Sequence, residues 1–246
     1  MKLSKEQLEE FNRNGFLILR GFYDTKNCEI IREIAKVHLK YKIEPIETEY
    51  EYISVDKDEF KKSVRRLRQV YDRDIVFKNW MRNEEIKPIL SQVLDEEPIL
   101  VTAHHNSIMT KKAKTSSSTE WHQDIRYWRY DSDNLVSVWL ALQEENQENG
   151  VLEFIPGSHK MQFNSEQFDE KEFFRADYEA NKDLISKKTS FELKTGDVVL
   201  FHCKLLHRAN ANMTNEDKIS FVYTVKGKSV NALANTRSSS FKEIEL

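Results

Sequence analysis

Apolar positions in the first hundred residues recur at the spacing of amphipathic helices. Ser4 and Gln7 form a capping-box pattern, which predicts that a first helix begins at this point. Helical spacing of apolar residues returns over 30–38 and again over 84–94. Only the short apolar run at 16–19 has the character of a strand, so we expect this part of the chain to be mostly helical.

The pattern changes beyond Pro98 to short runs of β-favouring residues separated by turn residues. These runs cover 99–109, 121–128, 135–142, 151–155, 191–193, 198–201 and 219–225. Many short strands joined by polar turns predict a sandwich or a barrel. A charged segment at about 160–188 interrupts them, and we expect it to be a helical insertion.

The 246 residues show no internal repeat and no stretch with the composition of a linker. We therefore expect one domain, 1–246, whose mostly helical part covers about 1–97. Because insertions in compact strand series are often functional, the segment at 160–188 is expected to form a mobile lid; a permanently docked helix is the alternative. With 39% hydrophobic and 11% aromatic residues, such a chain can bury a core.

Charge and cysteine content narrow the class of partner. The 41 acidic and 38 basic side chains nearly cancel, so no overall basic field favours a nucleic acid or an anionic membrane. Cys28 and Cys203 cannot make a disulfide framework, and neither a signal-like start nor an apolar run of roughly 18 residues is present. We expect a cytoplasmic protein that acts on a small molecule.

The first candidate for chemistry is the pair His122 and Asp124. If the run 121–128 is a strand, residues two apart share a face, and this imidazole and carboxylate point together. Such a pair is two thirds of the facial triad that binds iron(II) and leaves adjacent coordination positions open. A His-x-Asp tripeptide also occurs by chance, as a surface pair or a structural hydrogen bond, so the pair needs a third ligand.

Two histidines could supply the third ligand from a distant strand. His202 and His207 both follow the turn at Gly196-Asp197, and strand parity does not choose between them. His104 and His105 are rivals, but adjacent strand residues face opposite ways, so at most one of these two could join the cluster.

Several ordered motifs together resemble the phytanoyl-CoA dioxygenase family of iron(II)/2-oxoglutarate oxygenases. The motifs are Trp121-His122-Gln123-Asp124, Val138-Trp139-Leu140-Ala141-Leu142, Glu148-Asn149-Gly150-Val151-Leu152 and Ile155-Pro156-Gly157-Ser158-His159. The resemblance extends back to 15–19 and forward through 196–197 to His207. It leaves out the stretch 41–97 and the insertion, and its specificity comes from the order of several motifs.

The resemblance implies the fold and the metal ligands. The fold of the family is mainly β with flanking helices. It is a double-stranded β-helix, the cupin-like jelly roll, and iron binds at the open end of this barrel. The family's ligands fall on His122, Asp124 and His207, and His202 becomes a structural residue. The implied cofactors are Fe(II), 2-oxoglutarate as cosubstrate, and O2.

The resemblance also implies a binding site for 2-oxoglutarate, with one departure. In the family an arginine eleven positions after the distal histidine holds the far carboxylate of 2-oxoglutarate. Here Asn212 and Thr214 match the surrounding pattern, but the position holds Lys218, which has the charge of arginine without its two-pronged fork. The alternative for Lys218 is that it points to solvent beside its acidic neighbours and that Lys111 or Arg208 serves instead.

Lys111 and Trp139 match further cosubstrate-side positions; the alternatives are a solvated charge for Lys111 and core packing for Trp139.

The activity that the resemblance implies is hydroxylation of a C–H bond of a small-molecule metabolite, with release of succinate and CO2. Family relatives that halogenate lack the acidic ligand, and Asp124 is present here. Desaturation and ring rearrangement are alternative outcomes. Two other classes stay open: a catalytically silent binding or regulatory protein on the same fold, and a cupin metal enzyme that does not use 2-oxoglutarate.

Basic residues near the ligand motif suggest an anionic substrate. Arg126 and Arg129 follow the ligand pair, and Arg65, Arg66 and Arg68 lie where such proteins often build the substrate wall. The alternative is that these side chains are exposed and balanced by nearby acids. We expect Arg126 and Arg129 to contact the substrate, and the identity of that substrate is left open by the sequence.

Overall fold

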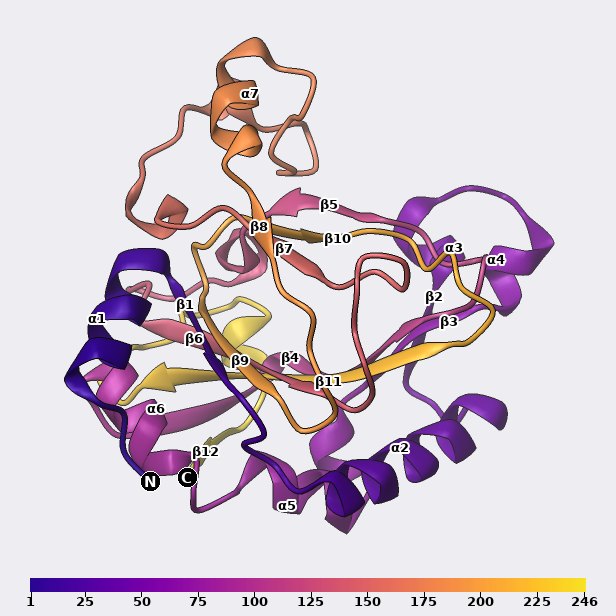
Figure 1. Ribbon diagram of the computed structural model, residues 1–246, viewed down its shortest axis with the longest axis horizontal. Coiled ribbons are helices and arrows are strands. Elements are labelled where there is room, and N and C mark those ends of the chain that lie inside the picture. The colour runs from indigo at the N-terminus through magenta and orange to yellow at the C-terminus, as the bar shows by residue number, and fades with distance from the viewer.

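Two antiparallel sheets form the body of the computed structural model, which describes residues 1–246 (Figure 1). The larger sheet contains β1 (Phe16–Leu19), β2 (Ile46–Thr48), β3 (Val64–Arg68), β4 (Pro98–Lys111), β6 (Leu135–Ala141), β9 (Val198–His202), β11 (Lys218–Gly227) and β12 (Glu243–Glu245). Its order is β1-β9-β6-β11-β4-β3-β2, and β12 pairs with β4. The smaller sheet, in the order β5-β10-β7-β8, contains β5 (Thr119–His122), β7 (Leu152–Phe154), β8 (Thr189–Ser190) and β10 (His207–Ala209). These facing sheets make the expected double-stranded β-helix, the jelly roll.

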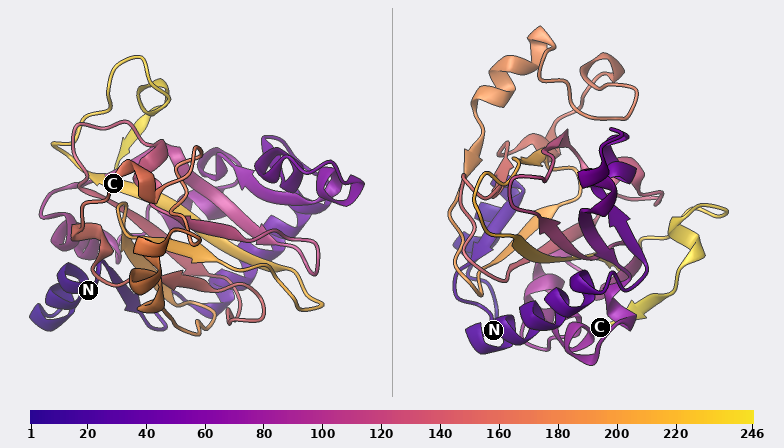
Figure 2. Two further views of the ribbon diagram at one scale, coloured as in Figure 1. Left: turned by 90° about the horizontal axis from the view of Figure 1, so that it is seen from above. Right: turned by 90° about the vertical axis from the view of Figure 1, so that its right-hand side faces the viewer.

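Helices cover the outer face of the larger sheet (Figures 1 and 2). The α-helices are α1 (Lys5–Asn14), α2 (Thr25–Lys40), α3 (Glu49–Ile53), α4 (Asp58–Lys62), α5 (Ile75–Met81), α6 (Lys87–Leu94) and α7 (Glu179–Ser186). Short 3-10 helices are η1 (Val70–Asp72), η2 (Asp124–Tyr127), η3 (Ser158–Lys160), η4 (Ser165–Gln167) and η5 (Ser238–Ser240). The expected capping box of Ser4 and Gln7 is present at α1. None of the helices combines the length and the apolar character needed to cross a bilayer.

The apolar core has two layers because the central strands are buried on both faces. Every residue of β6 is buried. Val138 and Leu140 pack in the core between the sheet and the helices, whereas Trp139 and Ala141 pack between the two sheets. This alternation follows from the two-residue period of a strand, and it turns Trp139 toward the interior of the jelly roll.

The N-terminal part is less purely helical than its sequence pattern predicts. The strand expected at 16–19 is confirmed as β1, and it pairs with β9 in the larger sheet. β2 and β3 also join that sheet, with β3 beside β4. The sequence pattern missed β3 because Arg65, Arg66 and Arg68 hide its apolar positions, Val64 and Leu67.

Two further local predictions are wrong, and a third holds only in part. The strand expected at 121–128 ends at His122, where the chain turns into η2. The run at 191–193 forms no strand, and only Leu193 makes an isolated bridge. The insertion at 160–188 is helical only in part: its one α-helix, α7, projects beyond the smaller sheet (Figure 1), and most of the remaining residues have no regular secondary structure. In these segments the tertiary contacts override the local preference for β structure or helix.

Candidate active site

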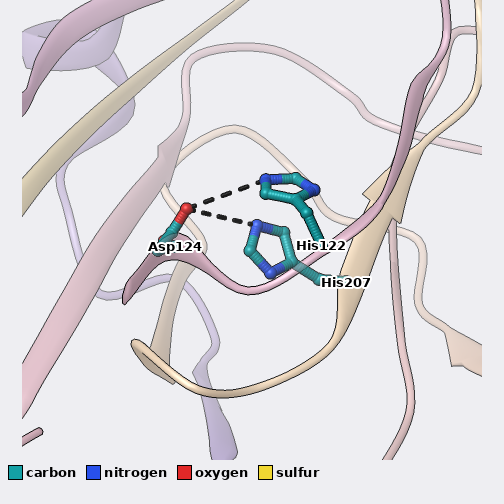
Figure 3. A group of neighbouring side chains, drawn as sticks. All are labelled: His122, Asp124 and His207. Carbon is teal, nitrogen blue, oxygen red and sulfur yellow. Dashed lines mark ion pairs between the residues drawn. The ribbon is translucent and has the colours of Figure 1, made fainter. Parts of the chain in front are cut away.

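The register of the smaller sheet brings two histidines together. His122 ends β5 and His207 begins β10, and they are directly paired residues of the two antiparallel strands. Their ring centroids are therefore 4.2 Å apart. Asp124 follows in η2, where the chain bends so that its carboxylate faces both imidazoles (Figure 3). His122 and Asp124 thus come together because the chain bends here, and not because both lie on one continuous strand, as predicted from the sequence.

The three side chains form a compact donor set. Asp124 Oδ1 lies 3.8 Å from His122 Nε2 and 3.6 Å from His207 Nε2. The Nδ1 atoms lie 2.8 Å from the Glu120 carbonyl oxygen and 2.9 Å from the Leu205 carbonyl oxygen, respectively. Because a carbonyl oxygen only accepts, each Nδ1 carries the proton and each Nε2 keeps its lone pair for the common centre. Two imidazoles and one carboxylate arranged in this way fit the facial set that iron(II) takes.

Burial and neighbouring charges keep these three side chains in the protonation states that metal binding requires. Burial alone would raise the pKa of Asp124, but His105 and His207 hold that pKa below its ordinary value. Burial and the neighbouring His207 lower the pKa of His122, and burial lowers that of His207. Near neutral pH the site therefore presents one carboxylate and two neutral imidazoles.

A pocket between the two sheets is lined by two of the three side chains, His122 and His207. Its lining includes all three residues expected on the cosubstrate side, Lys111, Trp139 and Lys218. All three are buried. The alternative that Lys111 is solvated is thus contradicted, and Trp139 both packs in the core and borders the pocket.

The ammonium group of Lys218 is hydrogen-bonded to two groups within the protein. Its Nζ donates to Glu145 Oε2 at 2.9 Å and to the Gly150 carbonyl oxygen at 2.7 Å. Glu145 was not singled out in the sequence, where it is one of several acidic residues in a polar turn. Its role becomes visible only through contacts with β6 and β11.

The remaining histidines lie outside the cluster. His202 Nδ1 accepts a hydrogen bond from the Lys204 amide at 3.1 Å, as expected for a structural residue. His104 stacks on Trp128 and contacts Ser238. His105 turns inward instead, and its Nε2 lies 2.8 Å from Asp124 Oδ1.

Of the two arginines expected to contact substrate, only Arg126 is buried at the site. Its guanidinium lies 3.8 Å from the ring centroid of Phe173 and 4.2 Å from that of Tyr127. Phe173 belongs to the insertion, and its ring also contacts His122 edge-on, with 6.2 Å between centroids. Arg129 is exposed, and its guanidinium donates to backbone carbonyls, including that of Arg126.

A jelly roll with this donor set defines the class of non-heme iron(II)- and 2-oxoglutarate-dependent oxygenases. The model of the phytanoyl-CoA dioxygenase (PhyH) family matches residues 11–220, so the chain belongs to that family. Its cofactors are Fe(II), 2-oxoglutarate and O2, and it is a dioxygenase.

Two named proteins and one solved structure are similar to this chain at low sequence identity. A probable alpha-ketoglutarate-dependent hypophosphite dioxygenase of Stutzerimonas stutzeri is 25% identical over 212 residues, covering 84% of this chain and 73% of the relative. An ectoine dioxygenase of Halomonas elongata is 24% identical over 251 residues, covering 90% of this chain and 70% of the relative. The crystal structure of the alpha-ketoglutarate-dependent carbocyclase SnoK from nogalamycin biosynthesis has a TM-score of 0.75 and 19% identity, covering 99% of this chain and 92% of that one.

Proposed function

We propose that the protein hydroxylates a C–H bond of a small-molecule metabolite and converts 2-oxoglutarate and O2 to succinate and CO2. The observation that supports this proposal most directly is the buried cluster of His122, Asp124 and His207, whose metal-binding atoms lie within 4.8 Å of one another. In the proposal these three residues hold the iron. One oxygen atom of O2 enters the product alcohol and the other enters succinate, so the overall reaction balances.

The protein's contribution is to hold and orient the groups that react. Iron, when bound, would supply the oxidation chemistry; His122 and His207 would hold it through Nε2 while each Nδ1–H donates to a backbone carbonyl oxygen. Asp124 is kept ionised and is oriented by Ser137, whose Oγ donates to Oδ2 at 2.8 Å. The pocket wall that contains Lys111 and Trp139 is the proposed binding surface for 2-oxoglutarate; Lys218 lies in the same wall, but its ammonium is bound to Glu145 and to the Gly150 carbonyl oxygen.

We further propose that the substrate carries an anionic group that Arg126 receives. Arg126 is only 9% exposed, makes no ion pair, and has an Nε without a hydrogen-bond partner. A buried guanidinium without a counter-ion is costly, and an anion entering the mouth would stabilise it. Hypophosphite, which names one relative, is a small anion, in agreement with this chemistry. Arg129 stays a weaker candidate because it is exposed.

The test is succinate formation from 2-oxoglutarate by the iron-loaded protein in the presence of ascorbate. We expect slow formation without substrate and faster formation with one member of a panel of small carboxylates and phosphorus oxyanions. Neutral analogues of the active compound, in which the anionic group is esterified, should stimulate much less. Absence of succinate under all conditions, with iron bound, would contradict the proposal and favour the two other classes, a silent binding protein or a metal enzyme that does not use 2-oxoglutarate.

A further inference from the structure

Two lysines lie side by side at one end of the pocket. Lys218, at the start of β11, is directly paired with Lys111, at the end of β4, so both side chains point to the same face of the sheet. Both are buried, with exposed fractions of 2% and 7%. Two like charges in a buried wall repel each other unless a counter-ion is supplied.

The protein supplies a counter-ion to only one of them. Glu145 is fully buried, and its carboxylate accepts hydrogen bonds from Lys218 Nζ at 2.9 Å, Ser220 Oγ at 2.6 Å and Trp139 Nε1 at 3.1 Å. Lys218 and Ser220 face the pocket from β11, and Trp139 faces it from β6. The carboxylate of Glu145 thus takes the donors that a ligand carboxylate would otherwise find at this position.

Lys111 is left as the one unpaired cation of the pocket lining. The other three cations of the lining are Arg65, Arg208 and Lys218, and each makes an ion pair, with Glu49, Glu153 and Glu145 respectively. Lys111 Nζ donates only to the carbonyl oxygens of Ser117, at 2.6 Å, and Ala209, at 3.3 Å. An ammonium group has three donors, so one remains for a ligand.

We propose that Glu145 acts as an internal counter-ion that withdraws Lys218 from ligand binding, so that Lys111 receives the far carboxylate of 2-oxoglutarate. The proposal rests on the proposed function and assigns the cosubstrate contact to one lysine of the wall, in place of the contact expected for Lys218. Burial and the positive charges of Arg65 and Lys218 also lower the pKa of Lys111, and an arriving carboxylate would offset both effects.

The experiment compares the binding of 2-oxoglutarate and pyruvate to the manganese(II)-loaded protein without oxygen, by titration calorimetry. Both compounds carry the 2-oxo acid group, but only 2-oxoglutarate has a far carboxylate. We expect the parent to prefer 2-oxoglutarate, and Lys111→Met and Lys111→Gln to weaken its binding roughly tenfold or more while pyruvate binding stays unchanged. Thermal unfolding and manganese stoichiometry verify that each variant is folded and loaded.

The matched control removes the other lysine together with its counter-ion. Lys218→Met alone would leave Glu145 buried and unpaired, so the control is the double variant Lys218→Met/Glu145→Gln. We expect it to keep the preference for 2-oxoglutarate. The inference is overturned if the double variant loses that preference while the Lys111 variants retain it. If neither oxo acid binds to the manganese-loaded parent, the proposed function itself fails, and the inference fails with it.

Discussion

His105 Nε2 lies 2.8 Å from Oδ1 of Asp124, the oxygen that also faces both imidazoles of the candidate iron site. Ser137 donates to the other oxygen, Oδ2, so both oxygens of the carboxylate have a side-chain partner. Partners of this kind orient the groups that bind a metal and tune its affinity. We therefore expect His105 to act as a positioning residue for Asp124, beside the proposed ligand set of two histidines and one aspartate.

We expect His105→Ala to weaken iron(II) or manganese(II) binding by roughly 10–100-fold, because Asp124 loses one of its two side-chain partners. His105→Gln, which can still donate a hydrogen bond, should recover part of the affinity. The measurement is metal titration by calorimetry. His104→Ala is the matched control, since its side chain points to Ser238 on the other face. Equal losses in the two alanine variants would contradict the positioning role.

Removal of a metal ligand should reduce metal binding more than removal of a residue, such as His105, that only positions a ligand. We expect His207→Ala to lose bound metal, because the facial set has no spare protein donor, and His202→Ala to retain it. The measurement is metal stoichiometry after dialysis. If His207→Ala keeps its bound metal and His202→Ala loses it, His202 and not His207 is the third ligand.

The insertion at 160–188 is proposed to be a lid. In the structure it is docked: the Phe174 amide donates to the Trp121 carbonyl at 2.7 Å, and Phe173 lies against His122. We expect hydrogen exchange in 160–188 to be fast in the metal-loaded protein and to slow when 2-oxoglutarate and substrate are added. Slow exchange both with and without ligands would identify a permanently docked segment.

Arg126 should control substrate binding without affecting the metal. We expect Arg126→Gln to raise the KM for an anionic substrate about tenfold or more, because the guanidinium has no other ionic partner. Metal stoichiometry and 2-oxoglutarate affinity should stay at the parent values. Arg129→Gln is the comparison, and an effect on KM confined to Arg129→Gln would place the anion outside the pocket mouth.

Asp197 should contribute stability that depends on pH. Its carboxylate accepts hydrogen bonds from the Gly21 and Lys194 amides at 2.7 and 2.9 Å and from Arg20 at 2.7 Å, tying the turn before β9 to β1. Burial alone would raise the pKa of Asp197, but these donors hold it below its ordinary value. Asp197→Asn should therefore lower the free energy of unfolding by about 1–3 kcal/mol at neutral pH.

The sign of the pH effect follows from the lowered pKa. The contribution of Asp197 is fully present above the pKa of an unfolded aspartate, about 3.9, and is lost as the pH falls through the lower pKa of the folded state. The difference between parent and Asp197→Asn in urea unfolding should therefore shrink in acid. A difference that is constant with pH would show that the ionised carboxylate is not the source of the stability.

The sequence by itself determined the features that depend on neighbouring residues. Ser4 and Gln7 predict the start of α1 because a capping box closes within one turn. Alternating or continuous apolar runs predict β1, β4, β6, β9 and β11, because burial of a strand face leaves its period in the chain. The spacing of His122 and Asp124 placed two candidate ligands within one short segment, and the ordered motifs indicated the family.

Tertiary structure decided whatever depends on residues far apart in the chain. His207 faces His122 because β10 and β5 are in that register, whereas strand parity left His202 equally eligible. Glu145 meets Lys218 across 73 residues, because β11 lies between β4 and β6 in the sheet. Local preferences carry no information about such a register, which is set by the total burial of apolar surface and by the pairing of buried charges.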